Sequence, residues 1–181
     1  MNQRIALTKK LLKHSLIELL QTQSIYQISI RELCQNAEIN RSTFYKYYGS
    51  QFDLLAEMEA DLLENIEHTL SVHEGDTENV IEQIIVYLER DIDFVRLLFN
   101  SNVDPDFPKK LFSLKSLYAS SNAAASFRSE KEYEYYSCFI LHGTYEIVHK
   151  WINKENREPP AWVASLIFKL ILHTENVKKR E

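Results

Sequence analysis

The side chains most suited to chemistry in this sequence lie close together, in and just before the stretch from Asn40 to Tyr48. This stretch contains no carboxylate, and none follows before Phe52. Its hydroxyls, phenols and cations are the donors that phosphate oxygens and base edges accept, so the pattern predicts contact with double-stranded DNA. The competing interpretation is an aromatic-rich turn that packs in a core. The candidate DNA-contact residues are Ser29, Arg31, Arg41, Ser42, Thr43, Tyr45, Lys46 and Tyr47.

Two short helices and a tight turn would hold these side chains. Ser29 and Glu32 form an S-x-x-E capping box, in which each side chain satisfies a backbone amide at the start of the first helix. Asn40 is a favoured cap for a second helix over 41–47, and residues 38–39 make the turn. Phe44 is the expected inward anchor. Two such helices joined by a three-residue turn describe a helix-turn-helix.

Helices are predicted on both sides of this unit. Residues 4–21 are amphipathic, with Leu12, Leu16, Leu19 and Leu20 inward and Lys9, Lys10 and Lys13 outward, either against the phosphate backbone or simply in solvent. Ser50 and Asp53 form a second capping box that starts a long helix over 51–71. Residues 73–76, with Gly75 as the stop, end that helix.

The rest of the chain reads as a helical bundle. Residues 77–100 are apolar on most of their circumference, which predicts one central helix, and 101–108 form a loop before a weaker helix over 109–127. Longer apolar-faced helices are predicted over 130–152 and 161–177. Few glycines and prolines agree with an all-α protein. We expect an N-terminal three-helix DNA-binding domain, 1–50, and a ligand-binding and dimerisation domain, 51–181.

The charges divide along the same boundary. The whole chain carries a net charge of −5, but residues 1–52 contain seven Lys/Arg and three Asp/Glu. The remaining residues are strongly acidic. A basic head on an acidic body is the charge distribution expected of a protein whose small head binds DNA. The body should be repelled by the duplex and project away from it.

The helix-turn-helix resembles the DNA-binding domain of TetR/AcrR-type transcriptional regulators. The similarity covers 12–55 and is most specific in the run T-F-Y-K-Y-Y, 43–48, followed by the capped helix. Three positions depart from the family pattern: Glu38 and Ser42 replace glycines, and Gln51 replaces a lysine. Glu38 should therefore be strained in a left-handed turn. The stretch D-F-V-R-L-L-F-N-S-N, 93–102, the Pro-Asp-Phe loop at 105–107 and the ending H-K-W-I resemble the C-terminal domain of Firmicute members; the family boundary of the head runs to about residue 65.

This resemblance implies a bacterial DNA-binding regulator, by the family's usual mode a repressor. It implies a homodimer formed through 130–152 and 161–177, a palindromic operator, and a small-molecule effector that enters the body. The alternatives are an activator, a regulator that responds to a protein partner, a helical interaction protein that does not bind DNA, and a small enzyme. No Gly-rich phosphate loop, nucleophile elbow or HExxH motif supports the last.

The effector site is the least defined expectation. Candidate lining residues for a hydrophobic or cationic compound are Tyr87, Tyr118, Tyr133, Tyr136 and Trp151, with ordinary core packing as the alternative for each. His142, Glu146 and His149 share one helix stripe, but nothing completes a metal shell, so we expect neither metal nor cofactor. Cys34 and Cys138 are expected to be buried free thiols in a cytoplasmic protein. No signal peptide or membrane span is predicted.

Overall fold

The computed structural model describes residues 3–72, 77–100, 103–114 and 129–177. Every regular element within these ranges is a helix, which confirms the all-α class. The helices are α1 (Gln3–Leu20), α2 (Ile30–Asn36), α3 (Arg41–Phe44), α4 (Gln51–Val72), α5 (Thr77–Arg90), α6 (Ile92–Phe99), α7 (Phe107–Phe112), α9 (Glu130–Ile152) and α10 (Pro160–Val177).

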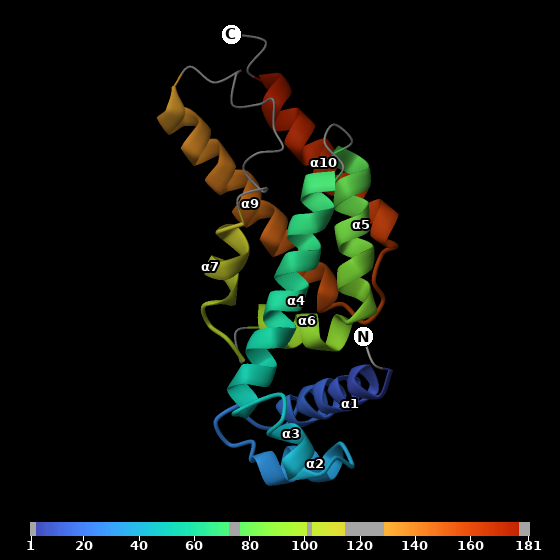
Figure 1. Cartoon of the computed structure of the whole chain (residues 1–181). Helices are drawn as coiled ribbons and strands as arrows, with labels where there is room; N and C mark the ends of the chain where they lie inside the picture. Colours follow the sequence, from blue (N-terminus) through green and yellow to red (C-terminus); the bar gives the residue numbers. More distant parts are fainter. Residues whose placement is uncertain (1–2, 73–76, 101–102, 115–128, 178–181) are drawn as a thin grey trace.

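The helices α1, α2 and α3 form a small head at one end of the molecule, and α4 runs from that head into the body (Figure 1). In the body α5 lies along both α4 and α10, and the C-terminal part of α9 packs against α6. The helix α6 lies across the end of the body that faces α1. Thus α4 is the element shared by head and body.

The core of the head is built from the leucines and aromatics that the sequence pattern places inward. Phe44 is fully buried, as predicted, and it packs against the buried ring of Tyr48 at a centroid distance of 5.5 Å. Leu12, Leu16 and Leu33 are also fully buried. Complete burial of side chains of this size stabilises each by about 1.5–3 kcal/mol, so a few large residues hold the head together.

The prediction of one helix over 77–100 is wrong. The chain breaks at Asp91, whose φ of −118° and ψ of 40° are not helical, and α5 and α6 run in different directions (Figure 1). The apolar residues that cover most of a single helical wheel therefore belong to two separate faces. Val80, Ile85 and Leu88 are buried on α5, and Phe94, Val95, Leu98 and Phe99 on α6.

The helix α7 begins before the predicted start at Lys109. Pro108 lies in its first turn, where a missing amide hydrogen costs nothing. Phe107, the residue before this proline, is fully buried beside Phe99, with ring centroids 5.8 Å apart. The helix therefore includes residues 107 and 108, the last two of the predicted loop. The helix ends at Phe112 and residues 113–114 are not helical, so the prediction of one helix over 109–127 is wrong there. The rest of that predicted range and the break at 73–76 lie outside the described residues.

Four other predicted helices are confirmed, α9 with the bounds expected and α4, α1 and α10 within one residue. Cys34 is buried, as expected, but the prediction for Cys138 is wrong, because its side chain is exposed. The apolar pattern around Cys138 misled the prediction because α9 presents part of that pattern to its surface. No helix in the described segments is both long and apolar enough to cross a bilayer.

Candidate nucleic-acid interface

The helix-turn-helix is held at its start by side-chain caps. Ser29 Oγ accepts a hydrogen bond from the Glu32 amide at 3.2 Å, and Asn40 Oδ1 accepts one from the Ser42 amide at 2.9 Å. These two caps are confirmed. The first capping box is only half formed, because the Glu32 carboxylate accepts from Gln23 Nε2 at 2.8 Å instead. That bond attaches the connector after α1 to α2.

The turn between α2 and α3 is a Schellman motif. The Ile39 amide donates to the Cys34 carbonyl at 2.9 Å and the Glu38 amide to that of Gln35 at 3.2 Å. Glu38 has a φ of 54°, the left-handed conformation that glycine adopts without a steric penalty. The predicted strain is thus located at this residue, between the two helices that present the candidate contacts.

Glu38→Gly should therefore stabilise the protein. The left-handed conformation costs a non-glycine residue about 1–2 kcal/mol, and the added freedom of glycine in the unfolded chain offsets part of the gain. We expect a net increase of about 0.5–1 kcal/mol in the free energy of unfolding, measured by urea denaturation. Glu38→Ala, which keeps the Cβ, is the control. A glycine variant no more stable than the alanine variant would contradict the assignment of strain.

The second helix is shorter than the predicted range 41–47. It ends at Phe44, and the chain continues as a tight turn in which the Tyr47 amide donates to the Phe44 carbonyl at 2.9 Å. This turn places Tyr48 in the core beside Phe44. We call residues 41–47, α3 with this turn, the reading segment.

The candidate DNA-contact side chains lie at the surface of the head. Arg41, Ser42, Tyr45 and Lys46 are exposed, and Thr43 and Tyr47 are half-buried. Ser29 and Arg31, at the start of α2, are exposed as well. The reading segment therefore presents two cations and several hydroxyl groups to solvent, while Phe44 alone is fully buried. The aromatic-core interpretation does not fit Tyr45, which is 58% exposed.

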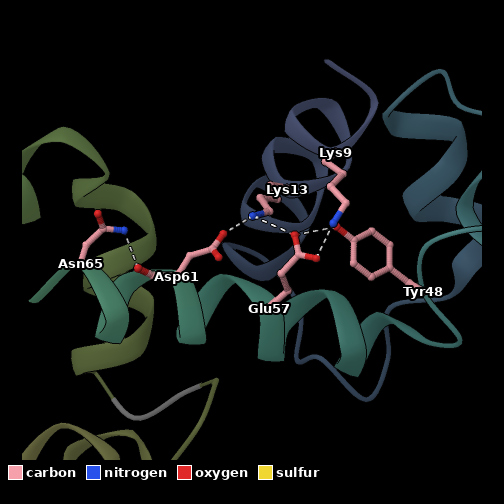
Figure 2. Close-up of polar contacts among 6 residues, drawn as sticks. All are labelled: Lys9, Lys13, Tyr48, Glu57, Asp61 and Asn65. Atoms are coloured by element: carbon pink, nitrogen blue, oxygen red, sulfur yellow. Dashed lines mark hydrogen bonds and ion pairs between the residues drawn. The ribbon is translucent and has the colours of Figure 1, made fainter. Parts of the chain in front are cut away.

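Two lysines that the helical pattern assigns to an outward face of α1 form ion pairs with carboxylates of α4. Lys9 Nζ lies 2.6 Å from Glu57 Oε2, and Lys13 Nζ lies 2.5 Å from Asp61 Oδ2 (Figure 2). Neither a phosphate contact nor a simple solvated face describes these side chains. Lys10 remains exposed. The acidic partners lie 48 residues further along the chain, so no local pattern could have revealed the pairing.

A TetR-type family model described as a transcriptional regulator C-terminal region matches residues 75–173, more than half of the chain. The chain belongs to the TetR family of transcriptional regulators. The family and the matched relatives are transcriptional regulators, so the chain is classed with regulators and not with enzymes.

Individual relatives of this TetR-family regulator are distant. The uncharacterized HTH-type transcriptional regulator YxbF of Bacillus subtilis is 20% identical over 167 residues, which are 88% of this chain and 43% of YxbF. The chain spans less than half the length of the curated relatives it matches. A solved structure of DhaS, a dihydroxyacetone kinase operon activator, aligns with a TM-score of 0.69 and 20% identity over 94% of this chain and 97% of DhaS. The structure of a TetR transcriptional regulator from Streptococcus agalactiae aligns with a TM-score of 0.67 and 21% sequence identity, over 94% of this chain and 96% of that chain.

The candidate effector residues occupy different surroundings. Trp151 is buried, and its indole Nε1 donates to the Glu158 carbonyl at 2.8 Å, which supports core packing for this residue. Tyr87 lines a polar surface groove along α4 and α5, and no other described candidate lines it. Tyr133 and Tyr136 are half-buried on α9. Tyr118 lies outside the described residues.

Each of the two histidines of the α9 stripe has a partner outside the stripe, and His149 Nδ1 also lies 3.7 Å from Glu146 Oε2. His142 Nδ1 lies 2.9 Å from the Cys138 carbonyl oxygen, and its ring packs on Phe112. His149 Nε2 lies 2.9 Å from Asn100 Oδ1, which connects α9 to the end of α6. Among the described residues no group of three or more His, Cys, Asp or Glu side chains could hold a metal ion.

A buried cluster between α4 and α7 has no sequence signature. Glu59 is 4% exposed, and its Oε2 accepts a hydrogen bond from Lys110 Nζ at 2.5 Å. The same ammonium lies 2.6 Å from Asp104 Oδ2. Burial, with a smaller contribution from the neighbouring Asp104, raises the pKa of Glu59 even though Lys110 acts in the opposite direction. Lys110 thus holds two carboxylates at the contact of α4 with α7.

Proposed function

We propose that this TetR-family regulator represses transcription by binding a palindromic operator as a homodimer, and that a small-molecule effector releases it. The observation that carries the proposal is the exposed, carboxylate-free reading segment on a basic head. A bacterial DNA-binding protein of this kind works in the cytoplasm, and we propose that location here.

The chemistry of the reading segment suits a major groove. Arg41 and Lys46 can neutralise phosphates or donate to guanine, and Ser42, Thr43 and the two tyrosines can donate to phosphate oxygens or base edges. Ser29 and Arg31 at the start of α2 would contact the backbone beside them. The acidic body, carried away from the head by α4, avoids the negative charge of the duplex.

The proposed subunit contact is on α9 and α10. An apolar groove with a volume of about 270 Å³ lies between these helices. Phe139 on α9 is 66% exposed and Leu170 on α10 is 45% exposed, and both line it. A second copy of the chain would cover these side chains through the same surface. Two heads related by a two-fold axis then read half-sites about 34–36 Å apart or a multiple of that spacing.

The effector is assigned to the body, where a compound that prefers a head separation unsuited to the operator would weaken binding. Such coupling is typically about 1–3 kcal/mol. Tyr87, Tyr118, Tyr133 and Tyr136 stay as candidate contacts, and Trp151 is the weakest of the set because its indole already has a backbone partner.

Binding to DNA that flanks the protein's own gene tests the proposal. Tyr45→Ala and Lys46→Ala should each weaken operator affinity by about 1–3 kcal/mol, measured by fluorescence anisotropy or gel shift. Lys46→Ala should also reduce the slope of log affinity against log salt by about 1 if the ammonium contacts a phosphate. Lys109→Ala, at an exposed lysine on α7 outside the head and the proposed subunit contact, is the matched control and should bind like the wild type.

Equal affinity of the wild type and both reading-segment variants would overturn the assignment of the interface. If the wild type prefers no DNA fragment over the others, the proposal that it binds an operator is wrong. A reporter gene placed behind the bound fragment then gives the sign of regulation: loss of the protein should raise expression for a repressor and lower it for an activator.

A further inference from the structure

One carboxylate on α4 joins three parts of the head. Glu57 Oε2 lies 2.6 Å from Lys9 Nζ, and Oε1 lies 3.1 Å from Lys13 Nζ, both on α1. Glu57 Oε1 also accepts a hydrogen bond from the hydroxyl of Tyr48 at 3.0 Å. Figure 2 shows these side chains converging between α1 and α4, with Asp61 one turn further along α4 and bonded to Lys13.

Tyr48 is the covalent neighbour of the reading segment. Its backbone amide donates to the Phe44 carbonyl at 3.0 Å, and its buried ring packs on the Phe44 ring. The position of this ring therefore fixes where the chain leaves the reading segment. The hydroxyl of the same ring donates to Glu57, so the residue that directly follows the reading segment is hydrogen-bonded to α4.

The protonation states favour a persistent connection. Partial burial acts to raise the pKa of Glu57, but hydrogen bonds from Lys9, Lys13 and Tyr48 outweigh it and leave the pKa below its usual value. Burial, followed by the bond to Glu57, raises the pKa of Tyr48 far above its usual value. At neutral pH the carboxylate is thus an acceptor and the phenol a donor.

We propose that Glu57 is a positioning residue for DNA recognition, which fixes the reading segment relative to α4 through the Tyr48 hydroxyl. The inference rests on the proposed function, since it assigns how the reading segment is oriented. Glu57 itself does not contact DNA in this proposal. Its second task is to hold Lys9 and Lys13, so that these cations do not strengthen binding to DNA of any sequence.

Two variants separate these tasks. Tyr48→Phe keeps the buried ring and removes only the hydroxyl, so it should weaken operator binding by about tenfold while leaving non-specific binding unchanged. Glu57→Gln keeps an oxygen that can accept from Tyr48 but loses the charge that holds Lys9, while Lys13 keeps its ion pair with Asp61. It should bind operator and non-specific duplex several-fold more tightly, because the released Lys9 makes one further phosphate contact in both complexes. Tyr48→Phe should therefore reduce the ratio of specific to non-specific affinity, whereas Glu57→Gln should raise both affinities.

The experiment measures operator and scrambled-duplex affinities of the whole 181-residue chain over a range of salt, at a temperature where circular dichroism shows each variant folded. The salt slope of operator binding should stay at the wild-type value for Tyr48→Phe, because no phosphate contact is lost, and should steepen for Glu57→Gln. Lys154→Met, which breaks the ion pair of Lys154 with Glu158 in the body, is the control for loss of an ion pair and should leave the ratio unchanged.

If folded Tyr48→Phe keeps the wild-type ratio of specific to non-specific affinity, the bond between Tyr48 and Glu57 serves stability alone and the inference is overturned, while the proposed function stands. An unchanged salt slope for Glu57→Gln would overturn the second task of Glu57. If the wild type itself prefers no fragment over scrambled duplex, the proposed function fails and this inference fails with it.

Discussion

Aspartate in place of both Phe139 and Leu170 should convert the protein to a monomer and weaken operator binding by about 100-fold or more. These side chains line the apolar groove between α9 and α10, and both are exposed in the single chain. Two carboxylates in a contact between identical surfaces would meet their own copies in an apolar surrounding, which is costly. Separated heads lose the second, intramolecular binding event, and linkage of this kind typically contributes a factor of about 100–10,000.

Sedimentation equilibrium at micromolar concentration, together with operator titration, measures this effect. Val72→Asp is the matched control: this residue is 57% exposed at the end of α4, does not line the groove, and should leave both mass and affinity unchanged. A wild-type mass equal to the 21.3 kDa of one chain would refute the homodimer.

Lys110→Met should destabilise the protein by about 2 kcal/mol at pH 8, because it leaves Glu59 buried without its cationic partner. Removal of one partner from a fully buried pair costs about 3–5 kcal/mol, and the value here is smaller because half of the Lys110 side chain reaches solvent. Methionine preserves most of the apolar stem that packs beside Glu59.

The loss should depend on pH in a defined direction. The pKa of Glu59 is already raised by burial, and removal of Lys110 raises it further. The folded state then holds a proton that the unfolded state releases above about pH 4.5, so stability falls as the pH rises through and above that value. The deficit of the variant should be less than half as large at pH 5 as at pH 8.

Urea denaturation at both pH values checks this prediction. Lys109→Met provides an adjacent control, because Lys109 is exposed and paired with exposed Asp106, and exposed pairs contribute little. The free energy of unfolding of that variant should stay within about 0.5 kcal/mol of the wild type at both pH values. Equal losses for the two variants would contradict the role given to Glu59.

The local chemistry of the head could be predicted from the sequence because it is encoded over three or four residues. Ser50 and Asp53 form the reciprocal capping box expected of them, since the Asp53 amide donates to Ser50 Oγ and the Ser50 amide to Asp53 Oδ2. Asn40 caps α3 for the same reason, and Glu38 shows its left-handed φ. These features depend only on neighbours in the chain.

Interactions between distant segments could not be predicted in this way. An outward position on α1 looks the same in sequence whether solvent, DNA or a carboxylate on α4 faces it. The ion pairs of Lys9 and Lys13 with α4 could therefore not be predicted. Asp91 breaks an apolar run because α6 must pack across the body, and Arg96 Nε donates to the Ile152 carbonyl at 2.7 Å. The aromatic side chains of the body carried no signal that separates packing from binding, as Trp151 illustrates.

Because only one of the two cysteine thiols is exposed, the folded chain can be labelled at a single cysteine. Cys34 is enclosed in α2, where burial raises the pKa of its thiol and keeps it protonated, whereas Cys138 faces solvent on α9. Because the thiolate is the reactive form, a maleimide dye added to the folded protein would attach at one place per chain. Fluorescence from that dye would follow the pairing of two chains in real time, with the natural amino-acid sequence intact.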